Sequence, residues 1–521
     1  MVKLTIDQIP VEVQEGLSVL EAAASLGIDI PTMCFKPGFT NHPSCMVCLV
    51  KEVDRDNLVP SCAMPVADGM DILTCSEEVI IARREALELL LSDHVGDCEA
   101  PCRLTCPAFL DIPLMNRLIA RGDFEQALRI VYEEIAIPSI LGTICPAPCE
   151  KACKRRSIDQ AVSICLLKRS AAEFGEEDWD IPISSGKKVA VIGTGPAGLS
   201  AAFYLLRSGH AVVLFDRHEK AGGTLRYDIP EDHLPREILQ TEIDTIRDMG
   251  AEFRLGIPVT LDLFHQTILP RFDAVILATG SRVTNPLESF GIQQDVQVDK
   301  HTLRTTIPGV FACGSIIREQ KMAVQSAAQG KLAAQQVESY LAASPGALRH
   351  KQRSVSAFGS LFEPEWKEYL QEAISDHRVE PAGGKLQGFS REEAIREAQR
   401  CMHCDCRKPV SCKLRQYGEQ YDASRKRFAA PDRNLLTRSV QHDLVVFETE
   451  KCIRCGLCVE ITNLNGESIG LTFAGRGFDV RISVPFNETI KAALTITARD
   501  CVESCPTGAL AFKEQEERNS R

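Results

Sequence analysis

The sequence predicts a multidomain chain of mixed α/β and α+β class, and three observations support this prediction. The 521 residues suit three to five domains. Residues 187–216 have the strand, tight turn, helix and strand pattern of a βαβ unit. Most of the 22 cysteines fall in C-x2-C, C-x3-C or C-x-C groups. Because such groups in a chain without an export signal indicate metal or redox sites, we expect several small cofactor-binding domains.

The composition favours an ordinary globular protein in a reducing compartment. Hydrophobic residues make up 44% and charged residues 25% of the chain, and the net charge is -12 with acids and bases interspersed. This charge argues against nucleic acid as a partner. The N-terminal sequence lacks the basic and apolar regions of a signal peptide, and no apolar run approaches membrane-spanning length. We therefore expect a cytoplasmic protein without membrane insertion.

The order of patterns along the chain predicts five segments. Short β-type runs and one helix, VLEAAASLG, fill the first segment, and residues 77–93 have helical period and strong helix formers. Helical pattern continues with cysteine-rich, proline-marked joints until the βαβ unit, after which strand patterns recur at AEFRLG and FDAVILATG. A polar stretch and two more cysteine groups follow. The predicted segments are 1–76, 77–180, 181–345, 346–435 and 436–521.

The first cysteine group has the spacing C-x10-C-x2-C-x13-C. Its members are Cys34, Cys45, Cys48 and Cys62. Four converging thiolates suit a [2Fe–2S] cluster, whereas zinc ribbons usually pair two C-x2-C knuckles and only one is present here. The sequences PTMCF and SCMVCLV resemble the ferredoxin-like domain of the large iron–sulfur subunit of NADH:quinone oxidoreductase, which iron-only hydrogenases share. The resemblance implies a β-grasp [2Fe–2S] domain, and we expect Cys75 to be a packed thiol outside it.

The second cysteine-rich stretch combines HVGDCEAPCRLTCPAFLDIP with CPAPCEKAC and AVSICLLKRSAAE. It resembles the N-terminal domain of the glutamate synthase small subunit and of dihydropyrimidine dehydrogenase. That resemblance implies an α-helical domain with two [4Fe–4S] clusters whose ligands interleave. One cluster would take Cys98, Cys102 and Cys153, and the other would take Cys106, Cys145 and Cys149.

Each of these two clusters needs a fourth ligand. The relatives have an upstream cysteine near the position of His94, and ELLLSDHVGDC resembles the NADH:quinone oxidoreductase subunit in which such a histidine ligates a [4Fe–4S] cluster. We favour His94 as a ligand over a solvated histidine at a helix end, since imidazole can replace thiolate and raises the potential. Cys165 is the candidate for the second cluster. The relatives have a non-cysteine ligand about three residues further on, but this chain has Lys168 there, and lysine is a poor iron ligand.

The βαβ unit carries Gly193-Thr-Gly195-Pro-Ala-Gly198 between the strand VAVI and a helix. Glycines there permit a tight turn and let a pyrophosphate approach the helix N-terminus. Asp216 ends the next strand, where an acid binds ribose hydroxyls. The fingerprint stands in its required context and predicts a dinucleotide site.

The sequences AGGTLRYDIPEDHLP, ILATGS and PGVFACGS extend the resemblance to the glutamate synthase family and imply FAD rather than NAD. Ser315 stands where the family usually has an aspartate, and Cys313 replaces a small residue. The implied FAD-binding residues are Gly193, Gly195, Pro196, Ala197, Gly198, Asp216, Arg217, Gly223, Thr224, Leu225, Ala278, Thr279, Gly280, Gly314 and Ser315.

The segment between Ser281 and Gly309 is shorter than one βαβ unit, which needs about 30 residues. No second G-x-G-x-x-G sequence is present in the chain. We therefore predict a Rossmann-like FAD domain without the NAD(P)H-binding insertion of the relatives. Electrons would then come and go through clusters, through a partner chain, or through a small substrate at the flavin.

Two cysteine groups follow near the C-terminus. Cys401, Cys404, Cys406 and Cys412 have the spacing C-x2-C-x-C-x5-C, for which we favour [4Fe–4S] over zinc because the neighbouring sites are iron–sulfur sites. The other group is Cys452, Cys455, Cys458 and the distant Cys505, which precedes a proline as in bacterial ferredoxins. This part of the sequence resembles the two-cluster ferredoxin module of NADH:quinone oxidoreductase subunits. The resemblance implies that the second cluster is lost and that Cys501 ligates no cluster.

The sequence thus predicts one [2Fe–2S] cluster, four [4Fe–4S] clusters and one FAD. Our first hypothesis is an electron-transfer subunit of a cytoplasmic multi-subunit oxidoreductase, whose partners would be an NADH-binding flavoprotein, a hydrogenase or formate dehydrogenase subunit, or ferredoxin. Electron bifurcation at the flavin is compatible with this hypothesis. The alternatives are an autonomous ferredoxin-linked flavoenzyme acting on a small substrate, and a non-catalytic scaffold with zinc in some sites.

Overall fold

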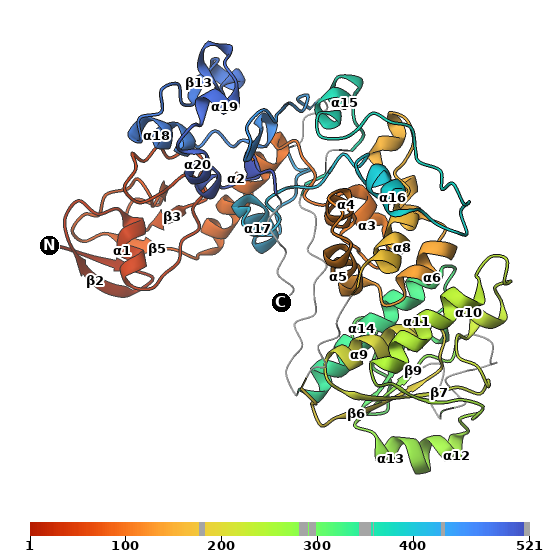
Figure 1. The fold of residues 1–521 in the computed structure, drawn as a ribbon. Helices are drawn as coiled ribbons and strands as arrows, with labels where there is room; N and C mark the ends of the chain where they lie inside the picture. The colour runs from red at the N-terminus through yellow and green to blue at the C-terminus, as the bar shows by residue number, and fades with distance from the viewer. Residues whose placement is uncertain are drawn as a thin grey trace. The chain divides into compact units, whose positions relative to one another are not determined.

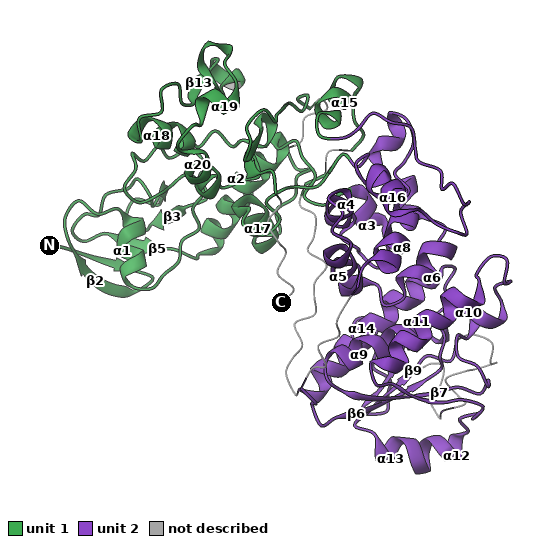
Figure 2. Ribbon diagram, in the orientation of Figure 1, with its two compact units in different colours: residues 1–100, 351–372, 402–521 green, residues 101–350, 373–401 purple. Residues whose placement is uncertain are grey.

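The computed structural model describes residues 1–176, 183–280, 290, 298–342, 356–357, 359–428 and 433–514. It divides the chain into two compact units, which Figure 2 shows in different colours. Unit 1 contains residues 1–100, 351–372 and 402–521, and unit 2 contains residues 101–350 and 373–401. The segment predicted as one linker, residues 346–435, is shared between the two units.

The N-terminal part of unit 1 is a mixed sheet of order β2-β1-β5-β3-β4 (Figure 1). β1 pairs in parallel with β5, and the other neighbours are antiparallel. Helix α1 follows β2, and Ser18 and Glu21 cap it reciprocally. The elements are β1 (Val2–Ile6), β2 (Ile9–Val13), α1 (Val19–Ser25), β3 (Leu49–Glu52), β4 (Asn57–Pro60) and β5 (Asp71–Leu73).

Helix α2 (Glu77–Asp93) confirms the helix predicted at 77–93. Ser76 caps its first turn, where two glutamates complement the helix dipole, and the chain leaves the helix at His94. Cys75 precedes this cap and is exposed, so the expectation of a packed thiol there is wrong. The turn between β5 and α2 places its side chain in solvent.

The remaining elements of unit 1 belong to its C-terminal part. They include an antiparallel sheet of order β11-β12-β15 and the pair β13-β14. The helices are α15 (Glu363–Leu370), α17 (Lys413–Gln420), α18 (Leu457–Leu464), α19 (Ile490–Ala493) and α20 (Ala498–Ser504). The strands are β11 (Arg438–Ser439), β12 (Val445–Glu448), β13 (Thr472–Ala474), β14 (Arg481–Ser483) and β15 (Leu510–Phe512).

Unit 2 begins with short helices that pack around one apolar core. Proline stands in the first turn of α4, α6 and α7, where its missing N–H is no loss. The helices are α3 (Pro101–Thr105), α4 (Ile112–Ala120), α5 (Phe124–Glu134), α6 (Pro138–Ile144), α7 (Pro148–Lys151), α8 (Ile164–Phe174) and, from the later segment, α16 (Arg391–Ala398). The same core continues into the neighbouring α/β part of the unit.

The α/β part of unit 2 is an all-parallel sheet of order β10-β9-β6-β7-β8. Alternate residues of β6 face opposite sides: Val189 and Val191 pack in one apolar cluster, and Ala190 and Ile192 in another. Figure 1 shows α9, α11 and α14 on one side of this sheet and α12 and α13 on the other. The predicted strands AEFRLG and FDAVILATG are β8 and β9, which confirms both.

The bounds of these elements are β6 (Lys188–Ile192), α9 (Pro196–Arg207), β7 (Ala211–Phe215), α10 (Thr224–Tyr227), α11 (Arg236–Asp248), β8 (Glu252–Arg254), α12 (Leu261–Leu263), α13 (Leu269–Arg271), β9 (Ala274–Leu277), β10 (Val310–Ala312) and α14 (Ala323–Leu341). β10 pairs directly with β9, so the chain returns to the same sheet after residues 278–309. Much of the short segment between Ser281 and Gly309, namely residues 281–289 and 291–297, lies outside the described residues. No helix in the described ranges combines the length and the apolar character that crossing a bilayer requires.

Candidate cofactor sites

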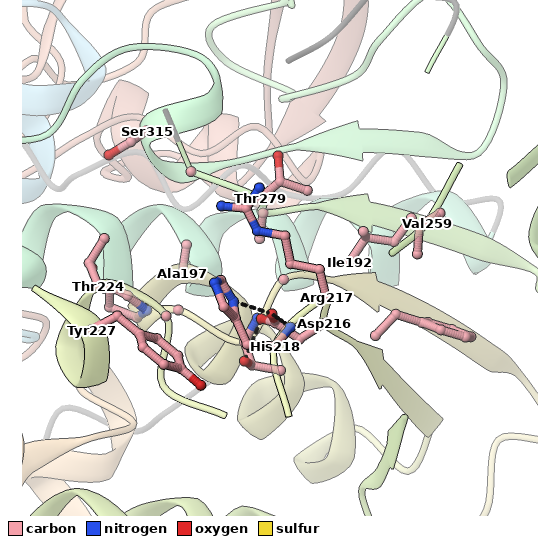
Figure 3. Close-up of a pocket in the computed structure, with 18 of the residues that line it drawn as sticks. Ile192, Ala197, Asp216, Arg217, His218, Thr224, Tyr227, Val259, Thr279 and Ser315 are labelled. Carbon is pink, nitrogen blue, oxygen red and sulfur yellow. Dashed lines mark hydrogen bonds and ion pairs between the residues drawn. The ribbon is translucent and has the colours of Figure 1, made fainter. Parts of the chain in front are cut away.

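A cavity of about 300 Å³ lies at the carboxyl ends of β6, β7 and β9 in unit 2. Parallel α/β sheets bind nucleotides at this edge, and the volume falls in the range of small-molecule sites. Figure 3 shows Arg217 at the end of β7 with its side chain extending toward Thr279. The cavity therefore has the position and a cationic wall that a dinucleotide requires.

The glycine fingerprint shapes the floor of this cavity. A Cβ atom on Gly198 would lie 1.9 Å from the carbonyl oxygen of Gly193, so only glycine permits this approach of α9 to the preceding turn. A Cβ atom on Gly195, in contrast, would meet no heavy atom within 4 Å. Gly195 caps the N-terminus of α9 and lines the cavity, so the open space beside it is where a pyrophosphate would approach the helix.

Asp216 is the acid predicted to bind ribose hydroxyls. Its Oδ2 accepts hydrogen bonds from the Thr194 amide at 2.8 Å and the Thr194 hydroxyl at 2.6 Å, and its Oδ1 contacts the His218 amide at 3.0 Å and the His218 Nδ1 at 2.9 Å. Burial opposes ionisation of Asp216, but the Thr194 and His218 donors lower its pKa below the ordinary value. The carboxylate thus orders the turn after β6 as well as facing the cavity.

Most predicted FAD-binding residues lie in the cavity wall. They are Gly193, Gly195, Pro196, Ala197, Asp216, Arg217, Gly223, Thr224, Ala278, Thr279, Gly280 and Ser315. Gly198, Leu225 and Gly314 are buried outside the lining. Cys313 is also outside it, because it is fully buried with its amide bonded to the Leu277 carbonyl at 2.9 Å.

Sequence reasoning missed two aromatic side chains in the wall. His218 and Tyr227 stack with ring centroids 4.4 Å apart and planes 26° apart, and both line the cavity. They present a flat surface of the kind against which a planar ring can pack. No spacing rule links them, because the contact depends on the turn that joins β7 to α10.

The first cysteine group converges in unit 1 as predicted from its spacing. The sulfurs of Cys34 and Cys45 are 3.4 Å apart. Hydrogen bonds from the Cys45 and Cys62 thiols hold the pKa of Cys34 well below its ordinary value, and a hydrogen bond from Cys62 lowers the pKa of Cys48 to about 7. All four thiols are buried, so this donor set fits a [2Fe–2S] cluster held away from water.

The last cysteine group also converges in unit 1. Cys452, Cys455, Cys458 and Cys505 line one small cavity together with Phe447, Ile482 and Leu510. Burial raises the pKa of Cys452 to about 12, and Cys505 adds to that shift. Cys501 lies outside this lining, and its buried thiol donates weak hydrogen bonds to the Cys458 carbonyl and the Thr497 hydroxyl. Four thiols in an apolar shell fit one [4Fe–4S] cluster.

In unit 2 the helices α3 and α7 pack together and bring the two cysteine groups of the helical segment into one core. Burial lowers the pKa of the Lys168 ammonium, but four surrounding thiols together raise it by more, so the net shift is upward. Those thiols are Cys165, Cys145, Cys149 and Cys106. The set predicted for the second interleaved cluster, including Cys165, is therefore gathered around one buried cation.

Cys102, Cys153 and Cys401 pack against the same apolar core of unit 2. The residue before Cys401 is Arg400, and its carbonyl oxygen accepts a hydrogen bond from the Arg155 guanidinium at 2.5 Å. Arg155 lies two residues after Cys153, so this contact ties the later segment to the neighbourhood of Cys153. Cys98, His94, Cys404, Cys406 and Cys412 belong to unit 1. Within the described residues no three His, Cys, Asp or Glu side chains are close enough to hold one single metal ion.

Replacing Lys168 with methionine will make the potential of the cluster predicted at its thiol neighbours more negative by roughly 50–130 mV, because a buried positive charge that favours the reduced cluster is lost. Methionine keeps the length of the side chain, which is 4% exposed. Redox titration followed by electron paramagnetic resonance (EPR) measures the shift. Lys151→Met is the matched control, because Lys151 is exposed on α7 beside the same cysteines. Equal shifts in both variants would contradict the assignment.

Comparisons with known proteins agree with three of the predicted domains. Residues 1–77 match the family model of a 2Fe-2S iron-sulfur cluster binding domain. Residues 92–179 match dihydropyrimidine dehydrogenase domain II with a 4Fe-4S cluster, and residues 191–250 match an NAD(P)-binding Rossmann-like domain. Both iron–sulfur domain types and the nucleotide-binding domain type are thereby confirmed.

Similar curated proteins are oxidoreductases. The chain is 35% identical over 195 residues to the NADPH-Fe(3+) oxidoreductase subunit beta of Geobacter sulfurreducens, covering 36% of this chain and 29% of that protein. It is 37% identical over 209 residues to the NADP(+)-dependent formate dehydrogenase subunit beta of Moorella thermoacetica, covering 35% and 29%. It is 38% identical over 191 residues to the glutamate synthase [NADPH] small chain of Mycobacterium tuberculosis, covering 36% and 39%. The resemblance to the glutamate synthase and dihydropyrimidine dehydrogenase module is confirmed, over less than two fifths of the length of each of these relatives.

A solved structure of an NAD+-reducing [NiFe]-hydrogenase covers 98% of this chain and 87% of its own, at 12% identity and a TM-score of 0.35. At that level of similarity the match carries no argument about fold or function.

Proposed function

We propose that this chain is an FAD- and iron–sulfur-containing electron-transfer subunit of a cytoplasmic multi-subunit oxidoreductase. It relays electrons between partner subunits, namely an NADH-binding flavoprotein and a hydrogenase or formate dehydrogenase subunit, or exchanges them with ferredoxin. The observation that carries the proposal is the packing of cysteines from separate groups in unit 1. Cys34 and Cys45 share one apolar cluster with Cys412 and Cys455.

This packing is what a relay requires of the polypeptide. Neighbouring cofactors must be close, and water must be kept from them so that each holds its charge state. Leu87, Leu91 and Leu414 fill the same cluster and separate its sulfurs from solvent. Iron–sulfur clusters exchange single electrons, and a flavin joins or separates pairs of them.

We assign FAD to the cavity of unit 2, although the matched domain model is named for NAD(P). The support is the resemblance of the closing sequence PGVFACGS to the glutamate synthase family, and the lining of the cavity by Ser315 of this sequence shortly after β10. The resemblances of the other segments support three further assignments. The N-terminal sheet with α1 is a β-grasp domain, and the helices α3 to α8 form the double-cluster domain. The C-terminal part of unit 1 is a ferredoxin-like domain with one cluster.

Metal and flavin analysis of the full chain, purified without oxygen, tests this proposal. We expect about 18 iron atoms per chain, matching acid-labile sulfide, and one FAD. Dithionite reduction should produce EPR signals of both cluster types. Abundant zinc in place of iron would overturn the proposal in favour of a scaffold. Rapid bleaching of the flavin by NADPH in the isolated chain would overturn the assignment of a relay that depends on partners.

A further inference from the structure

Two loops of unit 1 that are about 300 residues apart in sequence lie against each other. One follows α2 and contains His94 and Cys98, and the other precedes α17 and contains Cys406 and Cys412. Helix α17 packs on α2. An ion pair at 2.8 Å joins Arg415 of α17 to Glu99, and both side chains are almost fully buried. Because Glu99 follows Cys98 and α17 begins after Cys412, this pair fixes the two cysteine backbones relative to each other.

Hydrogen bonds and close packing fix the rest of this region. The Cys98 amide donates to the Ser356 carbonyl at 3.0 Å, and the Ser356 hydroxyl donates back to the Gly96 carbonyl at 2.7 Å. The sulfur of Cys406 lies 2.5 Å from where a Cβ atom of Gly508 would be, so the absence of a side chain at position 508 makes room for it. The amide of the residue after Cys412 donates to the carbonyl of Pro506 at 2.9 Å.

The three thiols of this region, Cys98, Cys406 and Cys412, are 7%, 7% and 5% exposed. Two of them, Cys98 and Cys412, flank the buried Arg415–Glu99 ion pair, and the third occupies the space that Gly508 leaves open. Buried thiols on two packed loops are the environment in which cysteines hold an iron–sulfur cluster away from water.

His94 adds an imidazole to the same loop. It is 8% exposed, and its Nδ1 is buried without a hydrogen-bond partner among the described residues. The neighbouring amide of Val95 donates to the Glu450 carbonyl at 3.0 Å, which orders the loop at that point. A buried ring nitrogen without a partner is costly, and a metal ligand role removes that cost.

Cys401 does not belong to the same compact unit as these three thiols. It belongs to unit 2, where its neighbour Arg400 bonds to Asp159 and Glu397 and is bonded by Arg155. The run of four cysteines from 401 to 412 is therefore divided between two units.

We propose that residues from both loops of unit 1 bind one [4Fe–4S] cluster. Its ligands are His94, Cys98, Cys406 and Cys412. The inference rests on the proposed electron-transfer function and refines it, because it moves Cys98 out of the set that the relatives' pattern gives to Cys102 and Cys153. Since Cys412 and Cys455 share one apolar cluster with Cys34, this site adjoins the other two of unit 1.

Iron counting in cysteine double variants of the full chain tests the grouping. Cys98→Ser and Cys412→Ser should each remove about four iron atoms and the same EPR signal, and the double variant should lose no more than either single variant. Cys98→Ser combined with Cys102→Ser should lose about eight, because those residues serve different clusters. The proposal would be overturned if the Cys98/Cys102 double variant lost only about four iron atoms, or if the Cys98/Cys412 double variant lost about eight.

Further variants test the fourth ligand of the cluster separately from the grouping of its three cysteines. Cys401→Ser should keep the EPR signal that Cys406→Ser removes. His94→Cys should keep full iron while lowering the potential of this cluster, since thiolate replaces imidazole. If Cys404→Ser removes this signal and His94→Ala keeps it, the histidine assignment is wrong. A wild-type chain without iron would instead refute the proposed function, so the two failures are distinct.

Discussion

Replacing Arg400 with alanine will destabilise unit 2 by about 3–5 kcal/mol, because it leaves the fully buried Glu397 carboxylate without its cation. Arg400 and Glu397 are both 0% exposed and are 3.0 Å apart, and Asp159 contacts the same guanidinium at 3.1 Å. The guanidinium also donates to the carbonyl oxygens of Asp376 and Gln160. Glu397 in turn accepts from the Ser163 and Val379 amides at 2.8 Å, so these bonds hold its carboxylate at the same place when the arginine is removed.

Differential scanning calorimetry should show this change as a fall of roughly 6–20 °C in the transition of unit 2. The matched control is Arg396→Ala, one turn earlier on α16. Arg396 is 64% exposed, pairs with the half-exposed Asp376 at 3.0 Å, and should cost at most about 1 kcal/mol. Similar shifts in both variants would mean that the buried network around Arg400 does not hold residues 373–401 against the rest of unit 2.

Local patterns predicted the local elements well. The helix at 77–93 has strong formers, a serine cap and acidic first-turn residues, so its bounds follow from the sequence alone. The strand–glycine–helix pattern at 187–216 likewise specifies β6, α9 and β7, because a parallel strand buried on both faces is a continuous apolar run. Cys34, Cys45, Cys48 and Cys62 also come together as their spacing suggested.

Long-range grouping of ligands could not be read in the same way. Cys401 and Cys406 are five positions apart yet lie in different units, because the Arg155 and Arg400 network holds one and the packing against Gly508 holds the other. Spacing rules treat neighbouring cysteines as one set, whereas tertiary contacts decide which thiols meet. The stacked pair His218 and Tyr227 escaped prediction for the same reason.

Replacing Gly195 with valine is expected to remove at least about 90% of the bound flavin while iron content and fold remain intact. A drop in occupancy of that size corresponds to a loss of at least about twentyfold in affinity at a flavin concentration near the dissociation constant. Gly195 has φ -74°, which any residue tolerates, and a Cβ there meets no protein atom within 4 Å. The valine side chain would instead occupy the space in which the pyrophosphate approaches the N-terminus of α9.

Flavin released by heat denaturation, relative to iron, measures the effect. Ser208→Val adds similar bulk at the exposed opposite end of α9 and should keep full flavin. Gly198→Val should behave differently from both, since its side chain would collide with the Gly193 carbonyl and destabilise the sheet as well as the site. Full flavin in Gly195→Val would place the cofactor elsewhere, because no dinucleotide can use this turn once a branched side chain fills the space beside it.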